Sequence, residues 1–475
     1  MIDTTLAQHL ARFAAATTFE DLPDAVADSV GMRVLDTLGI AIAATDLDTS
    51  RAAITWATEQ GGAAKAFAVG VEAALPGPMA AFVNGVLAHS LDFDDTHLPS
   101  ILHPSATVVP AALAAAQQHG ADGRTLVRGI AIGLEVCVRI GMAGFDPETQ
   151  NSVFFEHGQH ATSICGAMGG AVAAAVIGGA SEAKIVDTLG IAASMASGII
   201  EANRTGGTVK RMHCGWAAHS ALAAAGLARH GITGPPTVLE GRFGFFEAWL
   251  HQPGRASEIV DGLGTEWAVP NIFFKPYPAN HFTHAAVDAG AALRNRGIAP
   301  SDVEKLVLGV PAANLRTIGE PIEVKRTPTT GYMAQFSGPY ALAVGMFGGG
   351  GLGAALEDYS DELANAEDRR ALMAKVDVVP DARCDAIFPH QFPAVLTATL
   401  TDGTTVVEEV LTTRGGPERP LSFEEVSAKF RANAAPFMSE SDVAQLAERC
   451  HGLPDLTDIG TLLAPLRRIG TATRQ

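Results

Sequence analysis

Signals for β-strands are confined to one internal stretch of this 475-residue chain, which limits the folds it can adopt. Residues 394–413, AVLTATLTDGTTVVEEVLTT, contain two β-branched runs separated by Asp402-Gly403, a pattern typical of a β-hairpin. A further strand is predicted at 303–311, VEKLVLGVP. The pattern changes near Val269, so we expect an α+β unit at about 270–415.

The rest of the chain has the spacing of amphipathic or buried helices. Several predicted helices are followed by a glycine, a residue that is common at helix C-termini. The predicted helices before the α+β unit cover 24–44, 107–119, 161–177, 182–200 and 216–230. After Gly416 helices return, with a capping box at Ser422 and Glu425 and a last helix at 458–469.

Composition excludes several classes of protein. The formal charge of −18 argues against a nucleic-acid partner, although a local basic site for an anion remains possible. Five scattered cysteines without a CxxC pair indicate reduced thiols and a cytoplasmic location. No signal peptide is visible, and the uncharged stretch 161–181 is interpreted as a buried helix, not a membrane span.

Three polar, histidine-bearing loops each lead into a helix rich in small residues. They contain His103-Pro104-Ser105, the segment 156–160 ending in His160, and the segment 204–213 with Lys210, Arg211 and His213. Helix N-termini attract carboxylates and keep a nearby imidazole neutral. If these three helix starts converge, they form an anion pocket with proton-transfer groups inside it.

The first loop belongs to HSLDFDDTHLPSILHPS, residues 89–105, which is crowded with ionisable groups. A helix that ends near Leu91 leaves Asp92, Asp94 and Asp95 beyond its C-terminus, where negative charge is unfavourable. An acid close to substrate carboxylates would have a raised pKa. The structural alternatives are a helix-face His89, a solvated His97 and locally paired Asp94 and Asp95.

A metal site is an alternative for the same loop, with His89, Asp92, His97 and His103 as ligand types. However, the sequence has no HExxH motif, and the EF-hand pattern fails after Asp92. We therefore expect no metal and no cofactor.

Six segments resemble the MmgE/PrpD family, the 2-methylcitrate dehydratase-like proteins, in the family's order along the chain. They are HSLDFDDTH with HPSATVVPAALAAAQ, RVLDTLGIAIAA, GQHATSICGAMGGAVAAA, TVKRMHCGWAAHSALAAAGLA, KPYPANHFTHAAVDA and PTTGYMAQFSGPYALA. The resemblance implies a mostly α fold: a large all-helical domain from 1–269 and 416–475, with a smaller α+β lid domain inserted at 270–415. It also implies a homodimer.

The resemblance further implies metal-independent proton transfer next to a carboxylate of a small di- or tricarboxylate. By motif position, the catalytic candidates are Asp92, His103, His160 and Lys210. The substrate-binding candidates are Thr96, Arg211, His213, Lys275, Asn280, His281 and His284. One departure concerns the cis-aconitate decarboxylases of the family, whose histidine and lid tyrosine match Asn280 and Ile322 here.

We therefore expect a lyase of the dehydratase type that acts on a small polycarboxylate. Lys210 and Arg211 would bind carboxylates, His160 or His103 would exchange the proton, and Asp92 would act as an acid or orient a histidine. The alternatives are an epimerase of a dicarboxylate such as iminodisuccinate, a cis-aconitate-type decarboxylase, and a non-catalytic carboxylate-binding protein. No nucleic-acid or membrane partner is expected.

Overall fold

The computed structural model describes residues 4–202 and 207–469. It is 57% helical with 8% strand, which confirms the mostly α class with a small sheet-containing part. Packing divides the chain into two compact units. Unit 1 comprises Met1–Ile272 and Asn433–Gln475, and unit 2 comprises Phe273–Ala432. The sequence placed the corresponding limits at 269 and 415.

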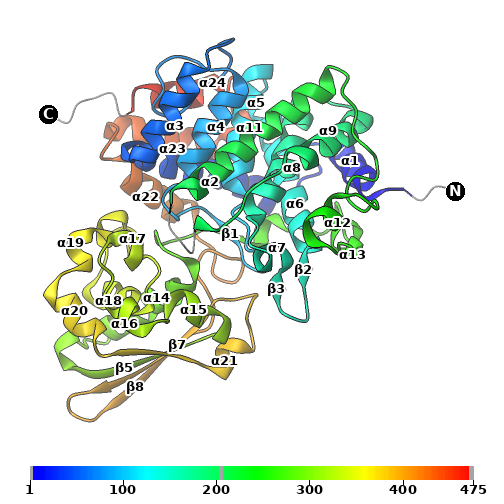
Figure 1. The fold of residues 1–475 in the computed structure, drawn as a ribbon. Coiled ribbons are helices and arrows are strands. Elements are labelled where there is room, and N and C mark those ends of the chain that lie inside the picture. Colours follow the sequence, from blue (N-terminus) through cyan, green and yellow to red (C-terminus); the bar gives the residue numbers. More distant parts are fainter. Residues whose placement is uncertain (1–3, 203–206, 470–475) are drawn as a thin grey trace. The chain divides into compact units, whose positions relative to one another are not determined.

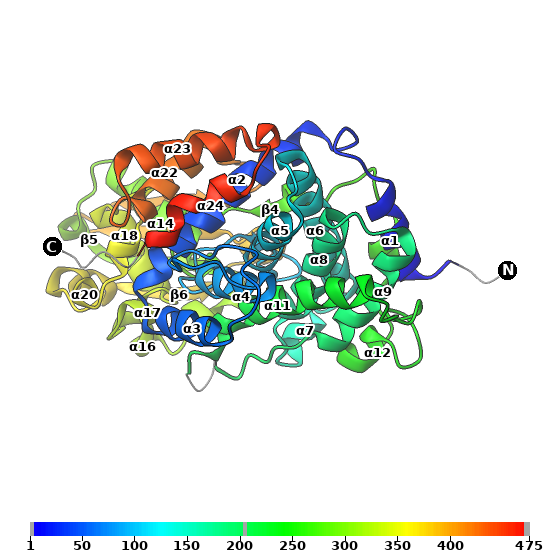
Figure 2. The ribbon, with the colours of Figure 1, turned by 90° about the horizontal axis from the view of Figure 1, so that it is seen from above.

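Unit 1 is built from helices packed around α8 (Ala161–Ile177), whose side chains are all buried. Helices α5, α6, α9 and α11 pack against it (Figures 1 and 2). The longer helices of the unit are α1 (Leu6–Ala16), α2 (Asp24–Ala43), α3 (Asp48–Glu59), α4 (Gly77–Ala88), α5 (Ser105–His119), α6 (Gly123–Ala143), α9 (Glu182–Met195), α11 (Val209–Arg229) and α23 (Glu440–His451). Within residues 4–202 and 207–469, no helix combines the length and apolar character needed to cross a bilayer.

Short elements connect these helices. They are β1 (Thr96–His97), β2 (Phe145–Asp146), β3 (Asn151–Ser152), α7 (Val153–Glu156), α12 (Phe245–Leu250), α13 (Ala256–Val260), α24 (Gly460–Leu463) and the 3₁₀ turns η1 (Ala44–Asp46), η2 (Val269–Asn271), η7 (Leu453–Asp455) and η8 (Ala464–Arg468). Strand β4 (Ile272–Phe273) spans the boundary between the two units.

Helices α4 and α11 approach closely because glycines face each other where they meet. A Cβ added to Gly215 would lie 2.5 Å from the carbonyl oxygen of Phe82, and one added to Gly85 would lie 2.8 Å from that of Cys214. Real Cβ atoms do not tolerate such distances, so only glycine permits this contact. The contact brings the first turns of α11 against the C-terminal half of α4, which ends next to His89.

Two helix starts differ from the prediction. Helix α11 begins at Val209 and not near Trp216, so Lys210, Arg211 and His213 lie in its first turns and not in a preceding loop. Helix α5 begins at Ser105 and not near Thr107, which places Pro110 inside the helix. Helix α8 has the predicted bounds, and α9 ends at Met195, five residues before the predicted end at residue 200.

Unit 2 contains a four-stranded sheet in the order β6-β5-β7-β8. Its strands are β5 (Val303–Val310), β6 (Val376–Pro380), β7 (Ala394–Leu400) and β8 (Thr405–Val410). Strands β7 and β8 pair antiparallel, with Thr399 opposite Thr405, which confirms the predicted hairpin. Strand β5 confirms the other predicted strand and pairs parallel with β6 and antiparallel with β7.

Helices α14 (His284–Asn295) and α18 (Gly338–Phe347) pack against each other and on this sheet (Figure 1). Tyr340, Leu306 and Leu396 belong to the buried core between them. The predicted capping box is present at α22 (Phe423–Ala434), where Ser422 and Glu425 exchange hydrogen bonds. The remaining helical turns of unit 2 are η3 (His281–Thr283), η4 (Pro300–Asp302), η5 (Ala312–Asn314), α15 (Leu315–Ile318), α16 (Ile322–Arg326), α17 (Gly331–Ala334), η6 (Leu356–Tyr359), α19 (Asp361–Ala364), α20 (Glu367–Met373) and α21 (Ala382–Asp385).

Candidate active site

The starts of α5, α8 and α11 lie together in unit 1, as the pocket hypothesis requires. The backbone N–H of His103, just before α5, donates to Thr162 Oγ1 in the first turn of α8 over 3.2 Å. His160 is the N-cap of α8, and its Nδ1 lies 3.0 Å from Nδ1 of His213 in α11. Three of the predicted site histidines therefore come from one cluster of helix ends.

His89, which follows α4, lies between these histidines. Its ring centroid is 5.5 Å from that of His103 and 5.3 Å from that of His160. Its Nδ1 lies 2.6 Å from Asp94 Oδ2, and both side chains are buried. The sequence left His89 open between a helix-face residue and a site residue, and the structure places it among the predicted catalytic histidines.

Burial and neighbouring charges give these histidines opposite protonation states. Burial lowers the pKa of His89, but the Cys214 sulfur and the Asp94 carboxylate outweigh it and raise the pKa to about 10. Burial and the nearby charge of His89 lower the pKa of His160 well below its ordinary value, and Lys210 adds to this effect. The pKa of His213 falls to about 4 for the same reasons. The cluster therefore combines a fixed imidazolium with neutral imidazoles at neutral pH.

The tautomer of His103 follows from its partner. Its Nδ1 lies 2.6 Å from the carbonyl oxygen of Asp95, which can only accept, so Nδ1 carries the hydrogen. Thr96 Oγ1 lies 3.3 Å from the same nitrogen. Nε2 is then the nitrogen that can accept a proton when this ring is neutral.

A buried ion pair fixes the loop that carries these groups. The Arg33 guanidinium of α2 donates to Asp95 Oδ2 over 2.8 Å, and its other terminal nitrogen donates to the carbonyl oxygens of Val269 and Ile272 at 2.9 Å. Asp95 also accepts from the backbone N–H and the hydroxyl of Ser105, at 3.1 and 2.5 Å. Asp95 thus ties the loop to α2 and to the start of α5, which is a positioning role.

The remaining candidates of unit 1 differ in their burial and in the groups that they contact. Lys210 lies close enough to His160 and His213 for its charge to lower the pKa of both. Asp92 is half-buried and has a left-handed backbone conformation with φ 52°, which aspartate tolerates better than most residues. Arg211 donates to Thr49 Oγ1 of α3 over 3.2 Å.

His97 is buried and paired with Ser100 Oγ at 2.6 Å, so the interpretation of a solvated His97 was wrong.

The candidates of unit 2 form their own group. The rings of His281 and His284 lie 4.5 Å apart by centroid, and Nε2 of His284 donates to the carbonyl oxygen of Ala279 over 3.2 Å. The Asn280 side chain accepts from the backbone N–H of Phe282, so it caps the turn η3. Lys275, His281 and His284 are buried.

Sequence reasoning missed the residues that give the cluster its charge pattern. Arg33, Asp94 and Cys214 received no site role, and each is buried. One signal was available: Arg33 interrupts an apolar helical run between Val30 and Val34, and a cation on a core face needs an anionic partner. The partner itself, 62 residues away, has no signature in the sequence.

The metal alternative rested on residue types within one loop. In the structure His89, His97 and His103 direct Nδ1 to different partners, namely Asp94, Ser100 and the Asp95 carbonyl. Among the residues that the structure describes, no group of three or more His, Cys, Asp or Glu side chains is arranged to hold a metal ion.

Fold and site together define a mostly helical two-unit protein with a buried histidine and carboxylate cluster suited to acid–base chemistry. The N-terminal domain model of MmgE/PrpD matches residues 8–257, and the C-terminal domain model matches 277–453. The chain belongs to the MmgE/PrpD family.

Three of the relatives found carry the name cis-aconitate decarboxylase. The chain is 30% identical to cis-aconitate decarboxylase of Homo sapiens over 409 residues, which cover 83% of this chain and 80% of that protein. The protein of the same name from Mus musculus is also 30% identical, with 83% and 79% covered. That of Aspergillus terreus is 26% identical over 478 residues, covering 96% and 94%.

Proposed function

We propose that this protein is a lyase that acts on a small tricarboxylate by moving a proton at the carbon next to a carboxylate. The observation that carries the proposal is the fixed imidazolium of His89 beside the neutral ring of His160, with centroids 5.3 Å apart. A neutral imidazole can remove a proton, and a buried cation can stabilise the enolate-like charge that this removal creates.

Substrate carboxylates would bind the Lys210 ammonium and the N-terminal N–H groups of α8 and α11. These groups favour anions both by charge and by unpaired donors. Binding a polycarboxylate here neutralises positive charge next to His160, so we expect its basicity to rise when substrate is bound. His103, with Nε2 as its basic atom, is the second candidate for the proton acceptor.

Dehydration is the outcome that we propose first. It needs a base for the proton, a cation for the developing charge and an acid for the leaving hydroxyl, and His160, His89 and Asp92 would supply these roles. Decarboxylation of cis-aconitate is the second candidate, because the relatives above carry that name. Two positions argue against decarboxylation. Asn280 matches the decarboxylase histidine, but here it caps η3. Ile322 matches the decarboxylase tyrosine, but it has no hydroxyl. The two remaining alternatives are epimerisation, which has no leaving group, and binding of a carboxylate without turnover.

One experiment separates these outcomes. The enzyme is incubated with 2-methylcitrate, citrate and cis-aconitate in deuterated buffer, and ¹H and ¹³C NMR follow loss of water, loss of carbon dioxide and exchange at the carbon next to the carboxylate. Water loss supports dehydration and carbon dioxide loss supports the second candidate. Exchange with neither loss indicates epimerase-type chemistry, and no exchange in any acid contradicts the proposal. We also propose a homodimer, which light scattering of the purified protein tests.

A further inference from the structure

A hollow in unit 1 lies at the opposite ends of the helices that begin at the histidine cluster. It has a volume of about 250 Å³ and is lined by the last turns of α5, α8 and α11 and by the start of α9. Arg229 and Lys210 are 19 residues apart on α11, so this hollow is about 28 Å from the cluster at 1.5 Å per residue. It is therefore a separate place on the molecule.

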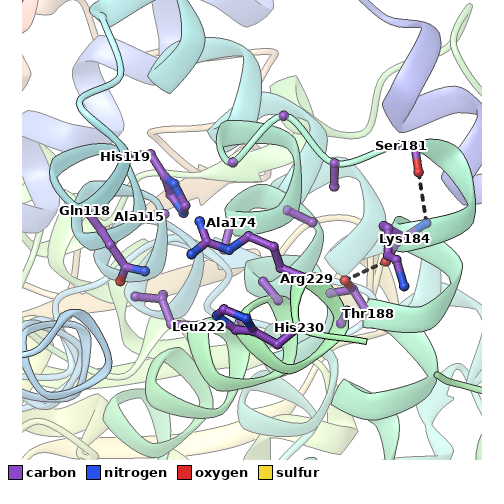
Figure 3. A pocket seen from close by; sticks show the side chains of 17 residues that line it. Ala115, Gln118, His119, Ala174, Ser181, Lys184, Thr188, Leu222, Arg229 and His230 are labelled. Carbon is purple, nitrogen blue, oxygen red and sulfur yellow. Dashed lines mark hydrogen bonds between the residues drawn. The ribbon is translucent and has the colours of Figure 1, made fainter. Parts of the chain in front are cut away.

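The lining of this hollow is basic on an acidic protein. It includes Arg229, Lys184, His119 and His230 but no aspartate or glutamate, whereas the whole chain carries a formal charge of −18. Figure 3 shows the Arg229 guanidinium directed toward His119, with Gln118 and His230 around it. The Lys184 ammonium is already paired with Asp187 at 3.0 Å. Arg229 is exposed and lines the hollow, and among the described residues it has no ion-pair partner, so its charge is available to an anion there.

The surroundings of Arg229 favour an anion over a cation or an apolar ligand. Burial lowers the pKa of His119, and the positive charge of Arg229 lowers it further. An anion between the two would offset the charge of Arg229 and could accept a hydrogen bond from either side chain. The start of α9 adds donors at its N-terminus, where Ser181 is the N-cap. The C-terminal carbonyls of three helices oppose an anion, and a charged guanidinium contact is strong enough to outweigh them.

We propose that this hollow is a second anion-binding site, for a small ligand with two or more negative charges such as a polycarboxylate or a phosphate. Arg229 is the principal contact, with His119, His230 and Gln118 as hydrogen-bonding partners. The proposal does not depend on the lyase activity, because binding and not turnover is its measure. The competing explanation is that Arg229 and His119 only offset the negative ends of their own helices, in which case the hollow binds no anion.

Two variants remove the site in different ways. Arg229→Gln removes the charge and keeps the length of the side chain. Gly226→Leu fills the space, since a Cβ at Gly226 meets no atom within 4 Å, and a helical glycine is replaced by a better helix former. The matched control is Arg242→Gln, which removes an exposed arginine outside the hollow.

Isothermal titration calorimetry with citrate and with inorganic phosphate, at constant ionic strength and in a Lys210→Gln background, measures the site without the catalytic cluster. We expect one anion to bind with a Kd of about 1 mM or tighter. Arg229→Gln should weaken binding by about tenfold or more, Gly226→Leu should abolish it, and Arg242→Gln should leave it unchanged. The tighter of citrate and phosphate identifies the ligand class. Absence of binding by both anions, or binding that survives both hollow variants, overturns the proposal.

Discussion

Nδ1 of His89 lies 2.6 Å from Oδ2 of Asp94, and the two side chains are 2% and 4% exposed. A buried imidazolium needs such a carboxylate, because removing one partner of a buried pair leaves the other charge uncompensated. Together with the Cys214 sulfur, this pair therefore favours positive charge at the centre of the histidine cluster, between His103 and His160.

Asp94→Asn should remove most of the activity, because His89 loses the carboxylate that, beside the Cys214 sulfur, favours its protonated form. We expect kcat to fall by about 10²–10³-fold, in the range that loss of one electrostatic stabiliser causes. NMR titration of His89 should show its pKa falling from about 10, because the part of the rise that the Asp94 carboxylate adds to that of the Cys214 sulfur is lost. If Asp94→Asn keeps its kcat while the pKa of His89 falls, the cation has no catalytic role.

Arg33→Met should destabilise unit 1 strongly, because it leaves the buried Asp95 carboxylate without its cation. We expect the free energy of unfolding in urea to fall by about 3–5 kcal/mol. The matched control is Arg124→Met, which breaks the exposed pair with Glu20 and should cost about 1 kcal/mol or less. Equal losses in the two variants would mean that the Arg33 pair does not anchor the loop.

Gly215→Ala should disrupt the contact between α4 and α11, since the new Cβ would lie 2.5 Å from the Phe82 carbonyl oxygen. We expect a loss of about 1–3 kcal/mol in urea unfolding. Gly226→Ala on the same helix meets nothing within 4 Å and should stabilise by up to about 1 kcal/mol. The account of this crossing fails if both substitutions act in the same direction.

Stability should fall as the pH is lowered from 6.5 toward 4, partly because of His213. Its pKa in the folded protein, about 4, lies below the ordinary value of 6.5, so the unfolded chain binds more protons in this window. The contribution of one such group is at most about 1.4 kcal/mol per pH unit. His213→Asn should flatten the pH dependence of urea unfolding. An unchanged slope in His213→Asn would show that His213 titrates normally.

Local patterns in the sequence were enough to predict much of the fold. Asp402-Gly403 predicted the hairpin, and Gly403 adopts the positive φ of 84° in the turn between Leu400 and Thr404, which glycine accepts without strain. The apolar run 161–177 predicted α8 correctly. Every side chain of this helix is buried, so its uncharged, apolar composition could be recognised without knowing which helices pack against it. The start of α11 was misplaced because Lys210, Arg211 and His213 look like loop residues, although in the structure they lie in the first turns of the helix.

The site was predicted only in part, for a different physical reason. His103, His160 and Lys210 could be proposed as site residues because each precedes or begins a helix, which is a local property. The roles of His89 and Asp94 depend on how the chain turns through Asp92 with positive φ, and that of Arg33 depends on a partner 62 residues away. Such long-range pairings are decided by packing, which no local pattern records.

The most direct test of the central claim is the rate of proton exchange by His160→Asn with the acid that the wild-type protein turns over. Asparagine keeps a polar side chain but cannot take up a proton, so we expect exchange at the carbon next to the carboxylate to fall by about 10²–10⁴-fold while the circular dichroism spectrum stays unchanged. Exchange at the wild-type rate in a folded His160→Asn variant would contradict the assignment of the base and the account of the cluster built around it.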